Sequence, residues 1–159
     1  ALSYNTNCVS EVGRDTCEYA GGEDYMNVYD LYENLLRQKT NVMNAIKTSN
    51  RFVFVDTEAL TTLFYANFLL NNNADKQKCQ NLAKSINDIT DWDLVLFLEP
   101  TVKFVQDGTR NEKIEADREK YSAQIKELLL KNGVDFICIS GDYNERFDTA
   151  KRIINHKFL

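Results

Sequence analysis

The segment at residues 52–62, FVFVDTEALTT, contains the residue best suited to chemistry, Asp56. The apolar run before Asp56 predicts a buried strand, and the residues after it predict a helix. Asp56 therefore falls at the carboxyl end of a parallel strand, where open α/β sheets bind ligands. In phosphoryl-transfer sites a carboxylate at such a position can hold Mg²⁺. The alternative is a structural one, since Asp is common as an acidic cap at the start of a helix.

A second group of charged residues follows a weaker apolar run at residues 7–10. Glu11, Arg14 and Asp15 stand at the predicted junction between this strand and a helix. They could hold a polar substrate, and Glu11 or Asp15 could accept a hydroxyl proton. Acidic residues also stabilise the start of a helix through its dipole. Both interpretations stay open from the sequence.

A third candidate is the polar segment at residues 104–118, FVQDGTRNEKIEADR, which lies between a strand end and a helix start. A segment of this kind can form a lid over an active site. Arg110 and Arg118 are its useful residues, because a guanidinium can bind phosphate oxygens with paired hydrogen bonds. The structural alternative is a solvated loop and helix start, since charged runs usually face water.

The last candidate is the turn at residues 140–144, SGDYN, where Gly141 and Asp142 follow an apolar run. Late loops of this kind hold the base of a nucleotide in many α/β folds, mostly through backbone groups. Helix capping by Asp142 would produce the same sequence pattern. Nucleotide contact and capping are therefore not separable here.

Composition excludes several classes of protein. The 159 residues, 43% apolar and 27% charged, predict one globular domain spanning residues 1–159. A net charge of −5 argues against contact with nucleic acid, which relies on clustered Lys and Arg. No apolar run approaches the roughly 20 residues of a membrane span, which predicts no membrane contact.

The four cysteines and one histidine are too widely spaced for a zinc site or a redox pair. Nothing in their spacing indicates a disulfide framework, which favours a reducing, cytoplasmic location. Cys138 lies within the apolar run FICIS, and we expect it to be a small residue of the core.

Apolar runs and helical segments alternate along the chain, which predicts an α/β fold with a doubly wound parallel sheet and helices on both faces. Continuous apolar runs are typical of strands covered on both sides. The predicted strands are residues 51–56, 94–98 and 135–140, with a weaker one at 7–10. The predicted helices are residues 26–48, 59–70, 76–88, 119–131 and 144–154.

These segments together resemble the NadR-type ribosylnicotinamide kinase domain, of the P-loop nucleoside kinase class. The resemblance covers nearly the whole chain, in the family's order. Its matching elements are VDTEALTT at 55–62, DLVLFLEPTVKFVQDGTR at 93–110, and ISGDY at 139–143 with ERF at 145–147. The resemblance implies a P-loop NTPase-like fold.

The function that the resemblance implies belongs to NAD salvage. It is transfer of the ATP γ-phosphate to the 5′-hydroxyl of nicotinamide riboside, with ATP and Mg²⁺ as cofactors. Asp56 would organise Mg²⁺, directly or through water, and Arg110 would act with it in catalysis. The other implied roles are substrate binding by Glu11, Arg14 and Asp15, and nucleotide binding by Arg118, Gly141 and Asp142.

Two departures from the family pattern stand out. Ser10, Val12 and Thr16 occupy a segment where the family often has aromatic residues. The sequence also contains no Gly-Lys pair, and so lacks the phosphate-binding loop of a P-loop kinase. We therefore expect a domain that begins upstream and whose first, central strand is missing here. Residues 51–56 and 94–98 would then have unpaired edges, and the chain alone would be inactive.

Two alternatives to this function remain. One is a regulatory module that senses NAD metabolites without catalysis, within a NadR-type transcriptional regulator. The other is a kinase for another nucleoside or small alcohol. The resemblance also admits adenylyltransferase and DNA-binding domains upstream, and association into homo-oligomers stays open.

Overall fold

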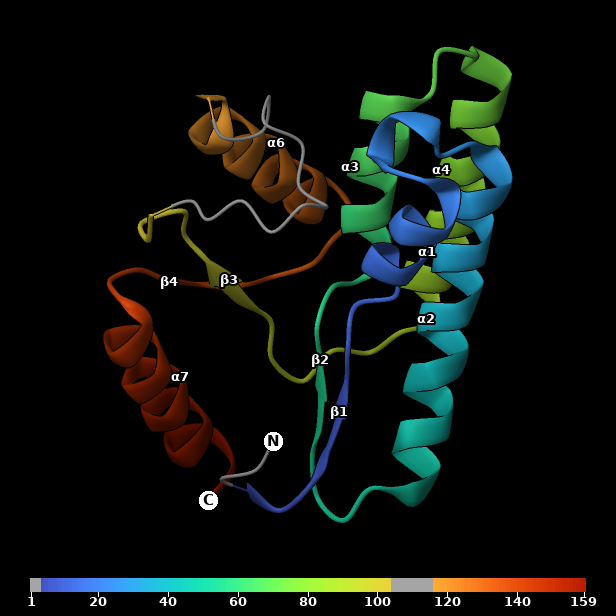
Figure 1. The fold of residues 1–159 in the computed structure, drawn as a ribbon. Helices are drawn as coiled ribbons and strands as arrows, with labels where there is room; N and C mark the ends of the chain where they lie inside the picture. Colours follow the sequence, from blue (N-terminus) through green and yellow to red (C-terminus); the bar gives the residue numbers. More distant parts are fainter. Residues whose placement is uncertain (1–3, 104–115) are drawn as a thin grey trace. The chain divides into compact units, whose positions relative to one another are not determined.

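The protein divides into two compact units, Ala1–Asp91 and Trp92–Leu159. The structure is a computed structural model that describes residues 4–103 and 116–159 (Figure 1). Each unit combines helices with one pair of parallel strands. The predicted α/β class and the parallel pairing are confirmed, whereas a single domain over residues 1–159 remains a prediction.

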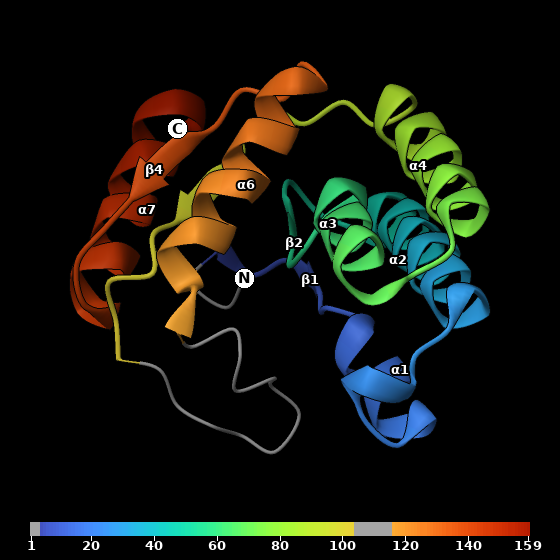
Figure 2. The ribbon, with the colours of Figure 1, turned by 90° about the horizontal axis from the view of Figure 1, so that it is seen from above.

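The first unit is built on two short strands, β1 (Asn7–Val9) and β2 (Val53–Val55). They pair in parallel, with Asn7 opposite Val53 and Val9 opposite Val55. The helices of this unit are α1 (Gly13–Ala20), the short 3-10 helix η2 (Glu23–Tyr25), α2 (Val28–Thr48), α3 (Ala59–Leu69) and α4 (Asn73–Asp88). Figures 1 and 2 show α2, α3 and α4 packed together on one side of the strand pair.

The core of the first unit lies between α2, α3 and α4. Leu31 and Leu35 of α2, Leu60 of α3 and Cys79 of α4 are all fully buried. Leu31 and Leu35 are four residues apart, so they project from one face of α2. Burial of this face holds the three helices together.

Local sequence explains where these helices begin. The Asn27 side chain accepts a hydrogen bond from the Tyr29 backbone N–H at 2.8 Å, and Asp30 completes a capping box at the start of α2. Asn72 caps α4 in the same way, since its side chain accepts from the Ala74 N–H at 2.8 Å. Asparagine oxygens satisfy backbone donors that have no partner within the helix. The asparagine run at residues 71–73 therefore marks a helix start, three residues before the predicted one.

The second unit contains β3 (Leu96–Leu98) and β4 (Ile137–Ile139), which also pair in parallel. Its helices, α6 (Arg118–Lys131) and α7 (Tyr143–Phe158), lie on opposite sides of this pair in Figures 1 and 2. Gly133 follows α6 with a φ of 74°, a left-handed conformation that glycine adopts without a steric penalty. The end of α6 at Lys131 agrees with the predicted helix at residues 119–131.

The strands are less covered than the continuous apolar runs predict. All of β2 is half-buried, and Ile137 of β4 is 43% exposed. The expectation that Cys138 is a core residue is wrong, because Cys138 is exposed. In the described part of the chain each sheet has only two strands. Every strand therefore lies at a sheet edge and has a strand neighbour on one side only. β2 and β3 belong to different sheets, and the expected missing strand remains a prediction.

All four cysteines are free thiols, of which Cys17 and Cys79 are buried and Cys8 and Cys138 are exposed. None of the helices in residues 4–103 and 116–159 is both long and apolar enough to cross a membrane.

Replacing Leu60 tests the core of the first unit. We expect Leu60→Ala to lower the free energy of unfolding by about 2–5 kcal/mol, because it leaves a cavity at a fully buried position. Leu36→Ala on α2 is the matched control, since Leu36 is 53% exposed and its loss opens no cavity. Urea unfolding monitored by circular dichroism measures both. Equal effects of the two variants would contradict this description of the core.

Candidate functional site

Asp56 follows β2 directly and is exposed. Its backbone is held on both sides: the Asp56 N–H donates to the Val9 carbonyl at 2.8 Å, and the Gln38 amide nitrogen donates to the Asp56 carbonyl at 2.8 Å. Among the described residues, the Asp56 carboxylate makes no hydrogen bond or ion pair. The structure therefore fixes the backbone at this position and leaves the carboxylate available to a ligand.

Thr57, the next residue, has a backbone conformation that is unusual for its type. Its φ of 73° lies in the left-handed region, which a β-branched residue rarely adopts. The Gln38 amide nitrogen also donates to the Thr57 carbonyl, at 3.2 Å. Strain of this kind persists only where surrounding contacts enforce it, and it gathers at functional sites.

Glu58 is the acid that caps α3. One carboxylate oxygen accepts from the Leu60 N–H at 2.6 Å, and the other accepts from the Thr61 N–H at 2.6 Å. The Thr61 hydroxyl donates to this second oxygen at 2.8 Å. Burial raises the pKa of Glu58, while these hydrogen bonds act in the opposite direction. The role of an acidic helix cap therefore falls to Glu58 and not to Asp56.

The charged segment after β1 lies beside Asp56, because Val9 and Val55 are paired in register. Glu11 is half-buried, and Arg14 and Asp15 are exposed. A Cβ atom placed on Gly13 would lie 3.3 Å from a Glu11 carboxylate oxygen, so this carboxylate covers the start of α1. The structure thus brings Glu11 and Asp56 to the same edge of one sheet.

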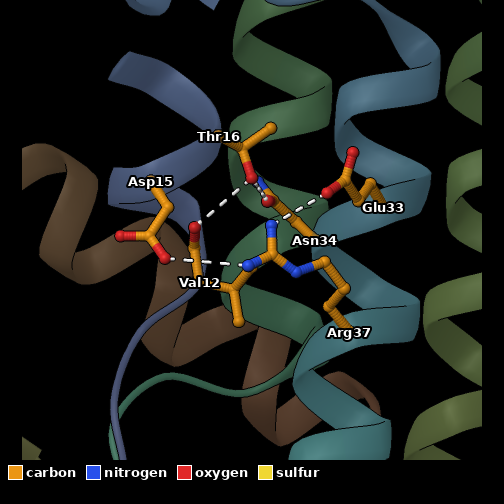
Figure 3. A network of polar contacts seen from close by, with 6 residues as sticks. All are labelled: Val12, Asp15, Thr16, Glu33, Asn34 and Arg37. Atoms are coloured by element: carbon orange, nitrogen blue, oxygen red, sulfur yellow. Dashed lines mark hydrogen bonds and ion pairs between the residues drawn. The ribbon is translucent and has the colours of Figure 1, made fainter. Parts of the chain in front are cut away.

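Helix α1 is tied to α2 by the polar network in Figure 3. Arg37 of α2 lies between two acids, 3.7 Å from the Asp15 carboxylate and 2.8 Å from that of Glu33. The ion pair gives Asp15 a structural contact in the first turn of α1. Its carboxylate is therefore engaged, in contrast to that of Asp56.

The buried part of the same network joins Thr16 to Asn34. The Thr16 hydroxyl lies 2.5 Å from the Asn34 side-chain oxygen and 3.3 Å from the Val12 carbonyl (Figure 3). Thr16, Asn34 and Gln38 are buried polar residues. Asn34 holds the segment after β1 through Thr16, and Gln38 holds the segment after β2. Buried polar groups are stable only when they are hydrogen-bonded, so these contacts fix how α1 packs on α2.

In the second unit, Gly141 and Asp142 form the turn after β4. Asp142 caps α7, accepting from the Asn144 and Glu145 N–H groups at 2.9 Å each. Glu145 returns a contact, since its carboxylate accepts from the Asp142 N–H at 2.8 Å. The capping role of Asp142 is therefore present in the structure. Nucleotide binding by Gly141 and Asp142 stays a prediction.

This turn is braced against the end of β3. The Arg146 side chain of α7 donates to the Gly141 carbonyl at 3.0 Å and to the Thr101 hydroxyl at 2.8 Å. It also donates to the Glu99 carbonyl. The Thr101 hydroxyl in turn lies 2.8 Å from the Gly141 carbonyl and 3.1 Å from its N–H. Both strand ends of the second unit are thus held by one guanidinium.

The acid at the end of β3, Glu99, is paired with Lys126 of α6. The hydrogen bond from Lys126 lowers the pKa of Glu99 and raises that of Lys126. A hydrogen bond to Glu99 raises the pKa of the neighbouring Cys138 thiol. Glu99 therefore has a structural role in the second unit, as the partner of Lys126.

Arg118, predicted to bind the nucleotide, begins α6 and donates to the Val102 carbonyl at 2.9 Å. This contact holds the segment after β3 against the helix. Arg110 and residues 104–115 of the predicted lid lie outside the described residues. Their roles stay predictions.

No group of three or more His, Cys, Asp or Glu side chains in the described residues could hold a metal ion. Mg²⁺ in nucleotide sites needs no such group, because it keeps several waters and binds one or two carboxylates together with the phosphates. One available carboxylate at Asp56 fits this requirement.

Gln38, Asn34 and Arg37 are site residues that sequence reasoning missed. A signal for the first two exists in the spacing of the buried residues of α2, which are Leu31, Asn34, Leu35, Gln38 and Val42. Asn34 and Gln38 interrupt an apolar face at helical spacing, which indicates a buried polar contact. No comparable signal marks the left-handed conformation of Thr57.

The family model described as AAA domain matches residues 1–146, which is most of the chain. The chain belongs to the AAA domain family. This membership agrees with parallel strands whose carboxyl ends carry the candidate residues.

Similar members of known function share the same region. The chain is 26% identical over 147 residues to the trifunctional NAD biosynthesis/regulator protein NadR of Escherichia coli. It is equally similar, at 26% over 147 residues, to the protein of the same name from Salmonella typhimurium. These matches cover 91% of this AAA domain chain but only 34% of either relative. The chain thus spans about a third of their length.

A crystal structure of NadR protein in complex with NR shares the fold. The TM-score is 0.85 at 19% identity, and the match covers 100% of this chain and 46% of the other. The P-loop NTPase-like α/β fold and the resemblance to NadR-type proteins, both predicted from the sequence, are confirmed.

The raised pKa of Glu58 predicts a pH dependence. The folded protein binds a proton at Glu58 more readily than the unfolded chain, so the contribution of this residue to stability is present at low pH. That contribution is lost as pH rises from the ordinary value through the raised one. Glu58→Gln cannot ionise, so its free energy of unfolding relative to the parent should rise between pH 4 and pH 7.

Urea unfolding at each pH measures this difference. Glu18→Gln on α1 is the matched control, because Glu18 is exposed. A difference between the parent and Glu58→Gln that falls or stays constant as pH rises would contradict the prediction.

Replacing Gly141 tests how closely the turn after β4 is packed. The φ of Gly141 is 102°, and an added Cβ would lie 2.4 Å from a Glu145 carboxylate oxygen and 2.9 Å from the Glu145 Cβ. Gly133→Ala is the control, because Gly133 also has a positive φ but no atom within 4 Å of an added Cβ. We expect Gly141→Ala to lower the free energy of unfolding by about 1–3 kcal/mol more than Gly133→Ala. Equal thermal and urea stabilities would contradict the steric argument.

Proposed function

We propose that this chain forms most of a single P-loop domain that phosphorylates nicotinamide riboside, giving nicotinamide mononucleotide for NAD salvage. The support is its membership of the AAA domain family and its similarity to NadR proteins named for NAD biosynthesis. The solved NadR structure binds NR, which agrees with this nucleoside as substrate.

One observation carries the proposal. Both backbone groups of Asp56 are hydrogen-bonded, while its exposed carboxylate makes no hydrogen bond or ion pair with other described residues. The carboxylate of Glu58, two residues further on, caps α3 instead. A carboxylate that is held in place and left unpaired is suited to a ligand, and in this class the ligand is Mg²⁺ or the substrate hydroxyl.

The remaining candidate residues take the other proposed roles. Glu11 and Arg14 bind the nucleoside, and Asp15 contributes through its ion pair with Arg37, which places α1. Arg110 offsets charge on the transferred phosphoryl group. Arg118, Gly141 and Asp142 bind the nucleotide.

ATP and Mg²⁺ are the proposed cofactors, with Asp56 as the protein ligand of the metal. When bound, Mg²⁺ neutralises phosphate charge. We assign the activity to the full-length protein, because this chain spans only about a third of the length of its NadR relatives. We place that protein in the cytoplasm.

A second candidate is a regulatory module that binds NAD metabolites without catalysis. The observation in its favour is that the relatives are named regulator proteins as well as biosynthetic ones. Such a module would bind the nucleoside but transfer no phosphate.

The test is ATP-dependent phosphorylation of nicotinamide riboside by the protein expressed from its complete coding sequence. We expect turnover, and we expect Asp56→Asn and Arg110→Ala each to lower kcat by about a hundredfold, because each removes a charge that stabilises the transition state. Asp91→Asn, at an exposed acid, is the control and should leave kcat unchanged.

The result separates the two candidates. Binding of nicotinamide riboside by calorimetry without turnover in the parent protein would favour the regulatory module. Turnover that is unaffected in both Asp56→Asn and Arg110→Ala would overturn the site assignment.

A further inference from the structure

We propose that Gln38 is a positioning residue, which acts by holding Thr57 in its left-handed conformation and so fixes the direction of the Asp56 carboxylate. This inference rests on the proposed function of Asp56. It assigns a role to a buried residue on α2 that lies outside the predicted site.

The geometry gives Gln38 two contacts with consecutive peptide groups. Its amide nitrogen has two hydrogens, and it donates to the Asp56 carbonyl at 2.8 Å and to the Thr57 carbonyl at 3.2 Å. In an extended strand, consecutive carbonyls point in alternate directions. Both can face one amide here because the chain turns at Thr57, where φ is 73°.

Packing alone does not explain a glutamine at this position. Gln38 is only 8% exposed, and its side-chain oxygen is buried with no partner among the described residues. An unpaired buried oxygen destabilises a fold, so an apolar residue would suit the core of α2 better. The donor end of the side chain is the part that the structure uses.

The contacts with Gln38 act directly on Asp56. The Asp56 N–H donates to the Val9 carbonyl, and the Asp56 carbonyl accepts from Gln38, so hydrogen bonds restrain the backbone on both sides of the residue. Without Gln38, Thr57 would relax to a negative φ and the peptide after Asp56 would turn. The carboxylate would then leave the direction in which it meets its ligand, and small misplacements of reacting groups slow catalysis strongly.

The proposal predicts a specific pattern of rescue. Gln38→Met keeps the length of the side chain but removes both donors. Thr57→Gly adopts a positive φ without strain, so a chain with this change does not need Gln38 to hold the turn. Asn41→Met, at an exposed position of α2, is the control for introducing methionine into this helix.

The experiment compares these variants in the full-length protein, singly and combined, by steady-state kinetics and urea unfolding. We expect Gln38→Met to lower kcat by about ten- to a hundredfold, with KM changed by less than about threefold. The Gln38→Met/Thr57→Gly double variant should recover most of the lost kcat and urea stability. On an Asp56→Asn background, Gln38→Met should lower kcat no further, because its effect passes through Asp56.

Other results overturn the proposal. Losses from Gln38→Met and Asp56→Asn that simply multiply, or a double variant with Thr57→Gly that recovers nothing, would mean that Gln38 does not act through this turn. If the parent protein does not phosphorylate nicotinamide riboside, the proposed function fails together with the catalytic role of Gln38. The rescue of urea stability by Thr57→Gly still decides whether Gln38 holds the turn.

Discussion

Burial of one face of α2 is the constraint on which the first unit depends. α1, α3, α4 and both strands of this unit contact α2, and its leucines fill the core that they share. Two polar side chains, Asn34 and Gln38, lie on the same buried face. The hydrophobic effect places the helix. The directional hydrogen bonds of these two residues then fix the positions of the segments that follow β1 and β2.

The two polar residues are one turn apart on α2, and each holds a segment that leaves the carboxyl end of a strand. Asn34 binds Thr16 of α1, and Gln38 binds the backbone at Asp56 and Thr57. One helix thus sets the positions of both charged segments at this edge of the sheet. The positions of the two segments are therefore coupled through α2.

The sequence was sufficient for the parts of the fold that local chemistry determines. Continuous apolar runs located the four strands in the described part of the chain, and the predicted helix at residues 119–131 ends where α6 ends. Asp142 could be recognised as a helix cap, although its role toward a nucleotide could not be separated from capping.

The rest depended on contacts between distant residues. The left-handed conformation of Thr57 depends on Gln38, which is 19 positions away, and a threonine gives no local sign of it. Cys138 was expected in the core because its neighbours are apolar, but its exposure depends on which elements cover β4. The partners of Asp15 and Glu99 were likewise unpredictable, since both partners lie on helices that are distant in the sequence.

The hydrogen bonds of Arg146 have a consequence for the proposed binding of a nucleotide by the second unit. The turn at Gly141 is tied to Thr101 by hydrogen bonds in both directions and to α7 by the guanidinium. A turn held in this way has little conformational entropy left to lose on binding, so little of the binding free energy is spent on ordering it. It also cannot reshape itself around molecules of different outline. For the proposed nucleotide, selection at this turn would therefore work by excluding molecules that do not fit the fixed backbone.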